Sequence, residues 1–175
     1  FVGIASGILG VLWALAQHDY KRLLAYHSVE NIGIILMGIG IGSLGVSHHA
    51  PVVAIVGFAG GLLHTVNHAL FKSLLFLCSG SVIHAVHTNE MTEMGGLRHK
   101  MPWTAGAMLV GCMAIAGAGI PFVIGLSGYY SKDLIIDAVH HQHELHPDNW
   151  VVTYAYWCVF LGVFVTAFYS FRLLF

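Results

Sequence analysis

The sequence contains little charge. Only 9% of its 175 residues are Asp, Glu, Lys or Arg, whereas a soluble domain carries about 25%. The seven basic and eight acidic residues give a formal net charge of −1, and no basic patch of the kind that binds nucleic acid is present. We therefore expect no nucleic-acid partner. Hydrophobic residues make up 57% of the chain, which predicts an all-α integral membrane protein surrounded by the lipid bilayer.

Cysteine is also scarce, and its placement argues against two classes of site. The three cysteines, Cys78, Cys112 and Cys158, each lie inside an apolar run. Their spacing matches neither a disulfide framework nor a CxxC metal site. Apolar runs begin at Phe1 and end at Phe175, without an initiator methionine or a signal-peptide pattern. We interpret the chain as a fragment of a longer multi-pass protein.

Apolar runs of about 20 residues, the length that crosses a bilayer, predict five transmembrane helices within a single membrane domain, 1–175. The predicted segments are 1–16, 24–43, 52–86, 103–138 and 150–173. The fourth is expected to be broken near 119–130, because glycine and proline weaken a helix. The residues concerned are Gly119, Pro121, Gly125 and Gly128.

The basic residues outside the membrane support this count. If the chain crosses at every segment, they all fall on one side: Lys21, Arg22, Arg98, Lys100 and Arg172. The opposite connections, 44–51 and 139–149, contain no Lys or Arg. By the positive-inside rule the basic side is cytoplasmic. We therefore expect the bacterial inner (cell) membrane, with an organellar inner membrane as the alternative.

Two further lysines, Lys72 and Lys132, fall inside predicted membrane segments. A charge at mid-bilayer costs about 3 kcal/mol on insertion scales, so such residues are usually functional. Lys72 follows His64 and His68 at intervals of four residues, which places the three on one helix face over about 12 Å. Histidine changes charge near neutral pH. The three residues, called the stripe below, therefore predict a proton relay.

Other interpretations of the stripe remain open. The histidines can hydrogen-bond neighbouring helices and only hold the bundle together, in a purely structural membrane module. His64 and His68, spaced i and i+4, can share a zinc ion, although the glutamate of an HExxH motif is absent. A multihaem electron carrier would use His64, His68 and His84 as axial ligands.

The predicted break contains a second group of candidates. Ser131 can cap a restarting half-helix, whose positive N-terminal end suits Asp133. The same dipole disfavours a cation on Lys132, which helps that lysine to release a proton. Because broken helices with ionisable residues mark ion sites in secondary transporters, we predict Lys132 and Asp133 as relay residues. The alternative is a surface loop with ordinary charges.

Two more titratable features deserve an interpretation. Glu30 lies about two turns into the second segment, where it can pair with His27 or a neighbouring helix on a proton entry path. Alternatively, it is a structural carboxylate near the interface. The histidine-rich stretch HHQHELH (140–146) is expected in an external loop. There it is either an ordinary solvated loop, a zinc-binding segment or a collector of protons.

Four stretches together resemble the antiporter-like subunits of respiratory complex I and its relatives. They are DYKRLLAYHS (19–28), HTVNHALFKSLLFLCSGSVIHAVH (64–87), MGGLRHKMP (94–102) and SGYYSKD (127–133). SGYYSKDLIIDAV and the terminal YAYWCVFLGVFVTAFYSFRLLF are similar to subunit L of NADH–quinone oxidoreductase. HSVENIGIILMGIG (27–40) is more similar to the hydrogenase-4 and formate hydrogenlyase membrane subunits, because subunit L usually has Ser-Gln where Glu30-Asn31 stand here.

The resemblance implies a fold and a function. The chain would form the second of two inverted five-helix repeats in a proton-translocating subunit, which is part of an enzyme but itself carries no cofactor. Lys72 would match the family's central lysine, His64 and His68 its companions, and Lys132 the lysine at the proton exit. Electron transfer elsewhere in an NADH–quinone oxidoreductase would drive proton pumping, with other membrane subunits as partners. The implied alternatives are a hydrogenase-linked complex and an Mrp-type Na⁺/H⁺ antiporter.

Overall fold

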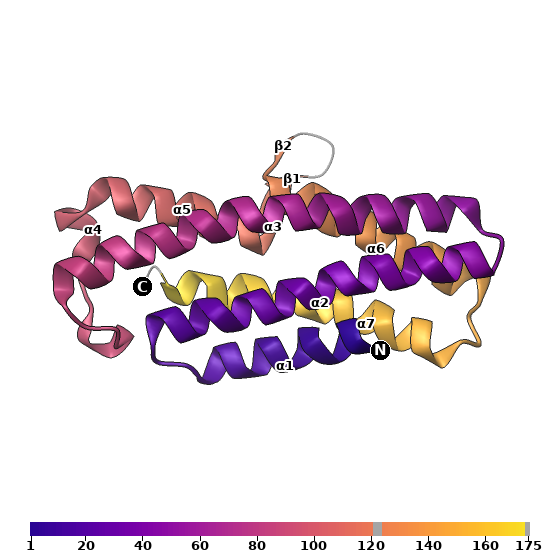
Figure 1. Ribbon diagram of the computed structural model, residues 1–175, viewed down its shortest axis with the longest axis horizontal. Coiled ribbons are helices and arrows are strands. Elements are labelled where there is room, and N and C mark those ends of the chain that lie inside the picture. Colours follow the sequence, from indigo (N-terminus) through magenta and orange to yellow (C-terminus); the bar gives the residue numbers. More distant parts are fainter. Residues whose placement is uncertain (121–123, 174–175) are drawn as a thin grey trace.

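The computed structural model describes residues 1–120 and 124–173, and nearly all of them are helical. The long helices are α1 (Val2–Ala16), α2 (Tyr20–Ser47), α3 (Pro51–Val86), α5 (Pro102–Ala116), α6 (Ser127–Leu145) and α7 (Trp150–Ser170). The short elements are η1 (Met91–Glu93), α4 (Leu97–Lys100), β1 (Gly119–Ile120), β2 (Ile124–Gly125) and η2 (Phe171–Leu173). The long helices lie roughly along one common axis (Figure 1).

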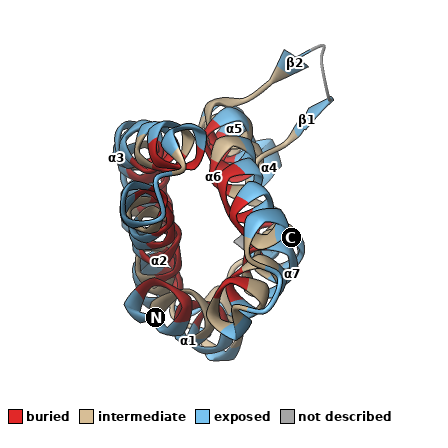
Figure 2. Ribbon diagram, turned by 90° about the vertical axis from the view of Figure 1, so that its right-hand side faces the viewer, coloured by how far each residue is buried: buried red, intermediate tan, exposed pale blue. Residues whose placement is uncertain are grey.

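Viewed along that axis, the long helices form a ring of α3, α2, α1 and α7, which is closed between α7 and α3 by α5 and α6 (Figure 2). The last two lie at opposite ends of the long axis, and each contacts both α3 and α7 (Figure 1).

Three clusters of buried apolar side chains are found within the described residues: a small one around Val11 and Ala14 of α1, and two larger ones. One joins the start of α2, the second half of α3 and α5, around Leu24, Leu75 and Ile115. The other joins α1, α2, α3, α6 and α7, around Ile34 and Ile135. Between the two clusters in the sequence of α2 and α3 lie five buried polar residues, His27, Glu30, Asn31, His64 and Asn67.

Glycine allows the first two helices to touch through their backbones. A Cβ atom added at Gly33 of α2 would lie 2.5 Å from the nitrogen of Gly7 and 2.6 Å from the oxygen of Gly3, both in α1. Small residues allow membrane helices to pack closely, and this packing favours their association because the hydrophobic effect does not act between helices in lipid. The α1–α2 pair therefore depends on the absence of a side chain at Gly33.

The connections meet at the two ends of the ring, as alternating crossings require. At one end the backbone nitrogen of Tyr20 donates to Asn89 at 2.9 Å, and Arg172 donates to the carbonyl of Leu15 at 2.8 Å. The elements that carry the basic residues outside the membrane meet here, at the left of Figure 1. At the other end the rings of His48 and His146 lie 4.3 Å apart. This arrangement agrees with the charge asymmetry of the sequence.

Among the residues that the structure describes, three helices are long and apolar enough to cross a membrane: α2, α3 and residues Trp150–Phe168 of α7. The helices α1 and α5 are apolar but shorter. The observed bounds match the expected segments closely for α1, α3 and α7, whereas α2 extends several residues beyond 24–43 at both ends. Five crossings therefore remain a prediction from the order and direction of the helices.

The expected break in the fourth segment is present but lies earlier than predicted. Helix α5 ends at Ala116, where Gly117 takes a left-handed conformation with φ of 74°, the usual glycine C-cap. A two-stranded antiparallel hairpin follows, which pairs Gly119 with Gly125 and projects from the ring at mid-length (Figures 1 and 2). Pro121, expected to help break the helix, lies outside the described residues.

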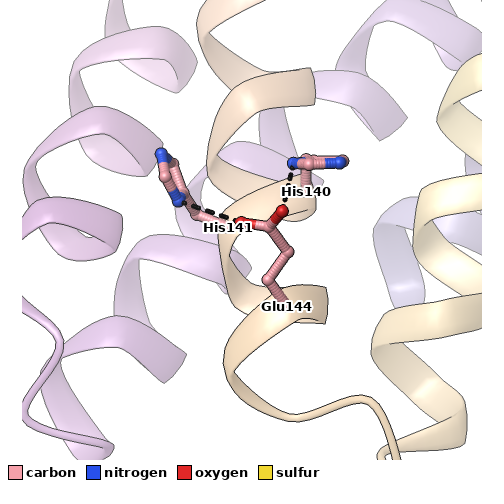
Figure 3. A network of polar contacts seen from close by, with 3 residues as sticks. All are labelled: His140, His141 and Glu144. Carbon is pink, nitrogen blue, oxygen red and sulfur yellow. Dashed lines mark ion pairs between the residues drawn. The ribbon is translucent and has the colours of Figure 1, made fainter.

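Helix α6 differs from the expectation at both ends. It restarts at Ser127, with Leu126 at the N-cap, so residues 127–130 are helical and Ser131 is not the cap. At the other end α6 continues to Leu145, so most of the histidine-rich stretch is helix rather than loop. Helical spacing there places the carboxylate oxygens of Glu144 3.8 Å from Nδ1 of His140 and 3.6 Å from Nδ1 of His141 (Figure 3).

Candidate functional site

A layer of buried polar side chains crosses the middle of the ring. Helices α2, α3, α6 and α7 all contribute to it, and we call it the polar layer. Its members are His27, Glu30, Asn31, His64, Asn67, Lys72, Ser131, Lys132 and Thr166, each at most 7% exposed. Ionisable groups inside membrane segments are costly and usually serve transport. The polar layer is therefore the candidate functional site.

His64 is the residue that joins three helices. It is fully buried on α3, with Nδ1 2.8 Å from the hydroxyl oxygen of Ser131 on α6 and Nε2 3.1 Å from Oδ1 of Asn31 on α2. The amide nitrogen of Asn31 donates to the carbonyl of His27 at 2.7 Å, which directs Oδ1 toward His64. Because Oδ1 only accepts, Nε2 of His64 carries a hydrogen.

Ser131 can satisfy His64 in either charge state. When His64 is neutral, the Ser131 hydroxyl donates to the unprotonated Nδ1. When His64 is protonated, Nδ1 donates to Ser131, whose hydroxyl can turn to the carbonyl of Ser127 at 3.3 Å or of Gly128 at 3.4 Å. A rotation of one hydroxyl therefore accompanies each change of charge on His64.

Lys132 is almost fully buried, and its ammonium lies at the end of another helix. Its Nζ donates to the carbonyl of Ile115 at 2.6 Å, in the last turn of α5. Carbonyls there lack partners within their own helix and attract a cation. The expectation that Lys132 lies at the disfavouring N-terminus of its own helix is wrong, because Lys132 is the sixth residue of α6 and its side chain reaches back to α5.

The other members of the stripe differ in their surroundings. Lys72 is buried and donates to the carbonyl of Leu24 on α2, with its ammonium 5.3 Å from the ring centre of Phe76. His68 is half-buried and its ring packs edge-on against Phe71 at 5.6 Å. The structure therefore places His64 and Lys72 in the polar layer, and His68 at its margin.

Glu30 belongs to the polar layer, but Asp133 does not. Glu30 is 1% exposed and accepts a hydrogen bond from Thr166 of α7. At 1.5 Å per residue along the helix axis, Glu30 lies about 15 Å from the start of α2. This depth does not fit a carboxylate at the interface. Asp133 is exposed, because successive helical residues point about 100° apart and Lys132 already points inward.

Three members of the polar layer were not candidates in the sequence: Asn31, Asn67 and Thr166. Asn67 donates to the carbonyl of Ser127 at 2.7 Å, and thereby ties α3 to the first turn of α6. Each is buried within about one helical turn of another buried polar residue of its own helix: Asn31 near His27, Asn67 near His64 and Thr166 near Ser170. That placement was the available signal, but only the fold shows which groups they meet.

The geometry also bears on the zinc and haem alternatives. Both ring nitrogens of His64 are engaged by Asn31 and Ser131, so His64 has no free lone pair for a metal. His84 lies about 30 Å beyond it along α3, a separation that rules out axial ligation at one depth. Within residues 1–120 and 124–173, no group of three His, Cys, Asp or Glu residues is arranged to hold a metal ion.

Comparison with known proteins identifies related chains. Residues 1–168 match the family model described as "NADH:quinone oxidoreductase/Mrp antiporter, TM". The chain is 53% identical to hydrogenase-4 component B of Escherichia coli over 131 residues, which are 75% of this chain and 19% of the relative. It is 41% identical over its whole length to F(420)H(2) dehydrogenase subunit L of Methanosarcina mazei, covering 24% of that relative.

A third relative has a lower sequence identity. NADH-quinone oxidoreductase subunit L of Rhodobacter capsulatus is 34% identical over the whole chain, which covers 22% of the relative. The chain thus spans about a fifth to a quarter of the length of these curated relatives. Because the family model covers nearly all of it, this chain belongs to the NADH:quinone oxidoreductase/Mrp antiporter family of antiporter-like membrane proteins.

Proposed function

We propose that this chain is the proton-translocating part of an antiporter-like membrane subunit in an NADH–quinone oxidoreductase of the complex I type. The single observation that supports this most strongly is the polar layer, in which His64 joins α2, α3 and α6 between two buried lysines. The family match and the relatives named as NADH-ubiquinone and NADH-quinone oxidoreductase subunits support the same assignment.

The proposed path follows the stripe and then crosses to α6. A proton passes from Lys72 past His68 to His64, and from His64 through the Ser131 hydroxyl toward Lys132. Water molecules would bridge the remaining gaps. The two hydrogen-bonding states of Ser131 support this step, because a relay residue must be stabilised both with and without its proton.

Glu30 would supply the negative charge that balances the path. It is the only buried carboxylate among residues 1–120 and 124–173, whereas Lys72 and Lys132 are both buried. Each unbalanced charge in a medium of low dielectric constant is costly. One carboxylate can offset one ammonium, so the loss of a proton from either lysine would leave the polar layer neutral.

The wider setting of the function is proposed as well. We infer five crossings, with α5 and α6 together as the interrupted one, in the second of two inverted repeats. The other membrane subunits would be its partners, and conformational or electrostatic signals from redox chemistry elsewhere in the complex would drive the protons. The basic end of the ring would face the cytoplasm in a bacterial cell membrane.

A hydrogenase-linked or formate-hydrogenlyase complex is the second candidate. The 53% identity to hydrogenase-4 component B and 45% identity to formate hydrogenlyase subunit 3, both of Escherichia coli, favour it. The Glu30-Asn31 pair points in the same direction. Purified parent complex oxidising NADH would support the first candidate, and oxidation of formate with release of hydrogen would support the second.

Replacing Lys132 by methionine tests the proposed path. Methionine keeps much of the side-chain length but cannot bind a proton. The variant also loses the hydrogen bond to Ile115, at a cost of about 1–3 kcal/mol, so pumping must be normalised to the amount of assembled complex. We expect redox activity with an artificial acceptor to persist and coupled proton pumping in vesicles to fall strongly.

Lys100→Met is the matched control for Lys132→Met. Lys100 is exposed at the end of α4, so its replacement removes an equal charge outside the polar layer. Wild-type pumping is expected for this control. Wild-type pumping in Lys132→Met would remove that lysine from the path.

A further inference from the structure

The hydroxyl of Thr166 on α7 faces two acceptors with a single hydrogen. Its Oγ1 contacts Oε1 of Glu30 on α2, and it also lies 2.6 Å from the carbonyl oxygen of Gly162, one turn earlier in α7. A hydroxyl group can donate one hydrogen and accept others. If its hydrogen goes to Gly162, the contact with Glu30 requires a hydrogen on the carboxyl group itself. The geometry therefore accommodates a protonated Glu30.

The other oxygen of the Glu30 carboxyl group also favours the protonated form. Oε2 is buried and has no hydrogen-bond partner among residues 1–120 and 124–173. The ion pairs found in the same part of the chain both involve Glu144, so neither of them neutralises Glu30. A buried charge without a donor or a counter-ion is far costlier than a buried neutral group. Protonation removes that charge.

The two helices that Glu30 faces bring no basic group to it. Helix α1 contains no ionisable side chain, and α7 contains tyrosines and one cysteine but no Asp, Glu, Lys, Arg or His. Helix α1 packs directly on Glu30, since a Cβ atom added at Gly10 would lie 2.5 Å from its backbone nitrogen. On α2 itself, His27 lies one turn earlier. The cations that act on Glu30 electrostatically are Lys132 of α6 and Lys72 of α3.

We propose that Glu30 is itself a proton-binding residue of the polar layer, and that Thr166 is the positioning residue that holds its carboxyl group in both charge states. When Glu30 is ionised, the Thr166 hydroxyl donates to Oε1. When Glu30 is protonated, its O–H donates to Oγ1 of Thr166, whose hydroxyl turns to Gly162. The Gly162 carbonyl does not depend on the hydroxyl, because a helix carbonyl accepts from the backbone N–H four residues later.

The proton on Glu30 comes from a lysine of the same layer, so this inference rests on the proposed function. An N–H bond of the Lys72 ammonium breaks, its electron pair stays on the amine nitrogen, and an O–H bond forms on Glu30. The total charge is unchanged, but two buried charges become two neutral groups, which a medium of low dielectric constant favours. Lys72 donates to the carbonyl of Leu24, about 9 Å from Glu30 along α2, and water molecules bridge that gap.

Infrared difference spectroscopy of the full-length subunit in its assembled complex tests the inference, because a protonated carboxyl group has a C=O stretching band that a carboxylate lacks. We expect Glu30→Gln to remove one such band. Thr166→Val cannot accept the hydrogen bond and should shift this band to higher frequency, whereas Thr166→Ser should restore it. Thr153→Val is the matched control and should leave the band in place, since Thr153 also donates to the carbonyl four residues earlier in α7, that of Asn149.

The band and the pumping assay separate this inference from the proposed function. If Lys132→Met loses pumping but Glu30→Gln removes no band, the inference is overturned and the proposed function stands. If Lys132→Met pumps like wild type while the Glu30 band is present, the proposed function fails and the proton on Glu30 stands. Equal band positions in Thr166→Val and Thr153→Val would exclude the role of Thr166. If Glu30→Gln fails to assemble, isotopically heavy glutamate assigns the band, and its shift or constancy in Thr166→Val decides the question.

Discussion

Replacing Ser131 by alanine removes one oxygen atom from the centre of the polar layer and leaves the helix intact. That oxygen lies 2.8 Å from Nδ1 of His64, and both residues are fully buried. In the variant, a neutral His64 loses the donor to Nδ1, and a protonated His64 loses the acceptor. The protonated form suffers more, because a charged group without its partner is the costlier one to bury.

The expected magnitude follows from that geometry. Both forms of His64 lose a partner, so only the extra cost to the charged form, about 1–1.5 kcal/mol, shifts the balance between them, which corresponds to roughly a five- to 13-fold lower population of protonated His64. If every transported proton passes through His64, the pumping rate should fall by a factor in that range. Redox activity with an artificial acceptor should change little, because Ser131 lies in the polar layer and we place the redox chemistry elsewhere in the complex.

The assay is proton pumping in reconstituted vesicles, normalised to assembled complex. Ser79→Ala is the matched control, since Ser79 is equally buried but donates to the carbonyl of Phe76 in its own helix at 2.8 Å. We expect wild-type pumping in Ser79→Ala. Equal pumping in Ser131→Ala and Ser79→Ala would refute the proposed role of the His64–Ser131 contact.

Two further variants test other parts of the account. Asp133→Asn should leave normalised pumping close to wild type, since Asp133 is exposed; a loss as large as in Lys132→Met would place Asp133 on the path. Gly33→Val should lower the midpoint of thermal unfolding, because its Cβ would lie 2.5 Å from the Gly7 nitrogen and overpacking costs about 1–3 kcal/mol. Gly40→Val on the same helix, where a Cβ meets nothing within 4 Å, is its control, and equal midpoints would contradict the backbone contact.

Much of the helix layout could be predicted from local properties of the sequence. Apolar length predicted the segments that became α1, α3 and α7, and glycines predicted the interruption between α5 and α6. The i, i+4 spacing of His64, His68 and Lys72 predicted a common side of α3, although His68 lies at the edge of the inward face. These features depend on one helix at a time, so a single sequence suffices for them.

The cross-helix features were harder to predict. Asn31 and Ser131 meet His64 because of how α2, α3 and α6 pack, which no spacing along one helix reveals. The surroundings of Lys132 were predicted wrongly for a related reason. Its long side chain reaches the C-terminal carbonyls of α5, and the restart of α6 at Ser127 moved Lys132 away from the first turn.

The central claim is that protons cross the membrane through the polar layer, and Lys72→Met tests it most directly. The quantity to measure is the number of protons pumped per electron pair in vesicles that contain the assembled parent complex. Lys21→Met, at an exposed position near the basic end of the ring, is the matched control. The account predicts a clearly lower ratio in Lys72→Met and the wild-type ratio in Lys21→Met. A wild-type ratio in Lys72→Met would contradict it.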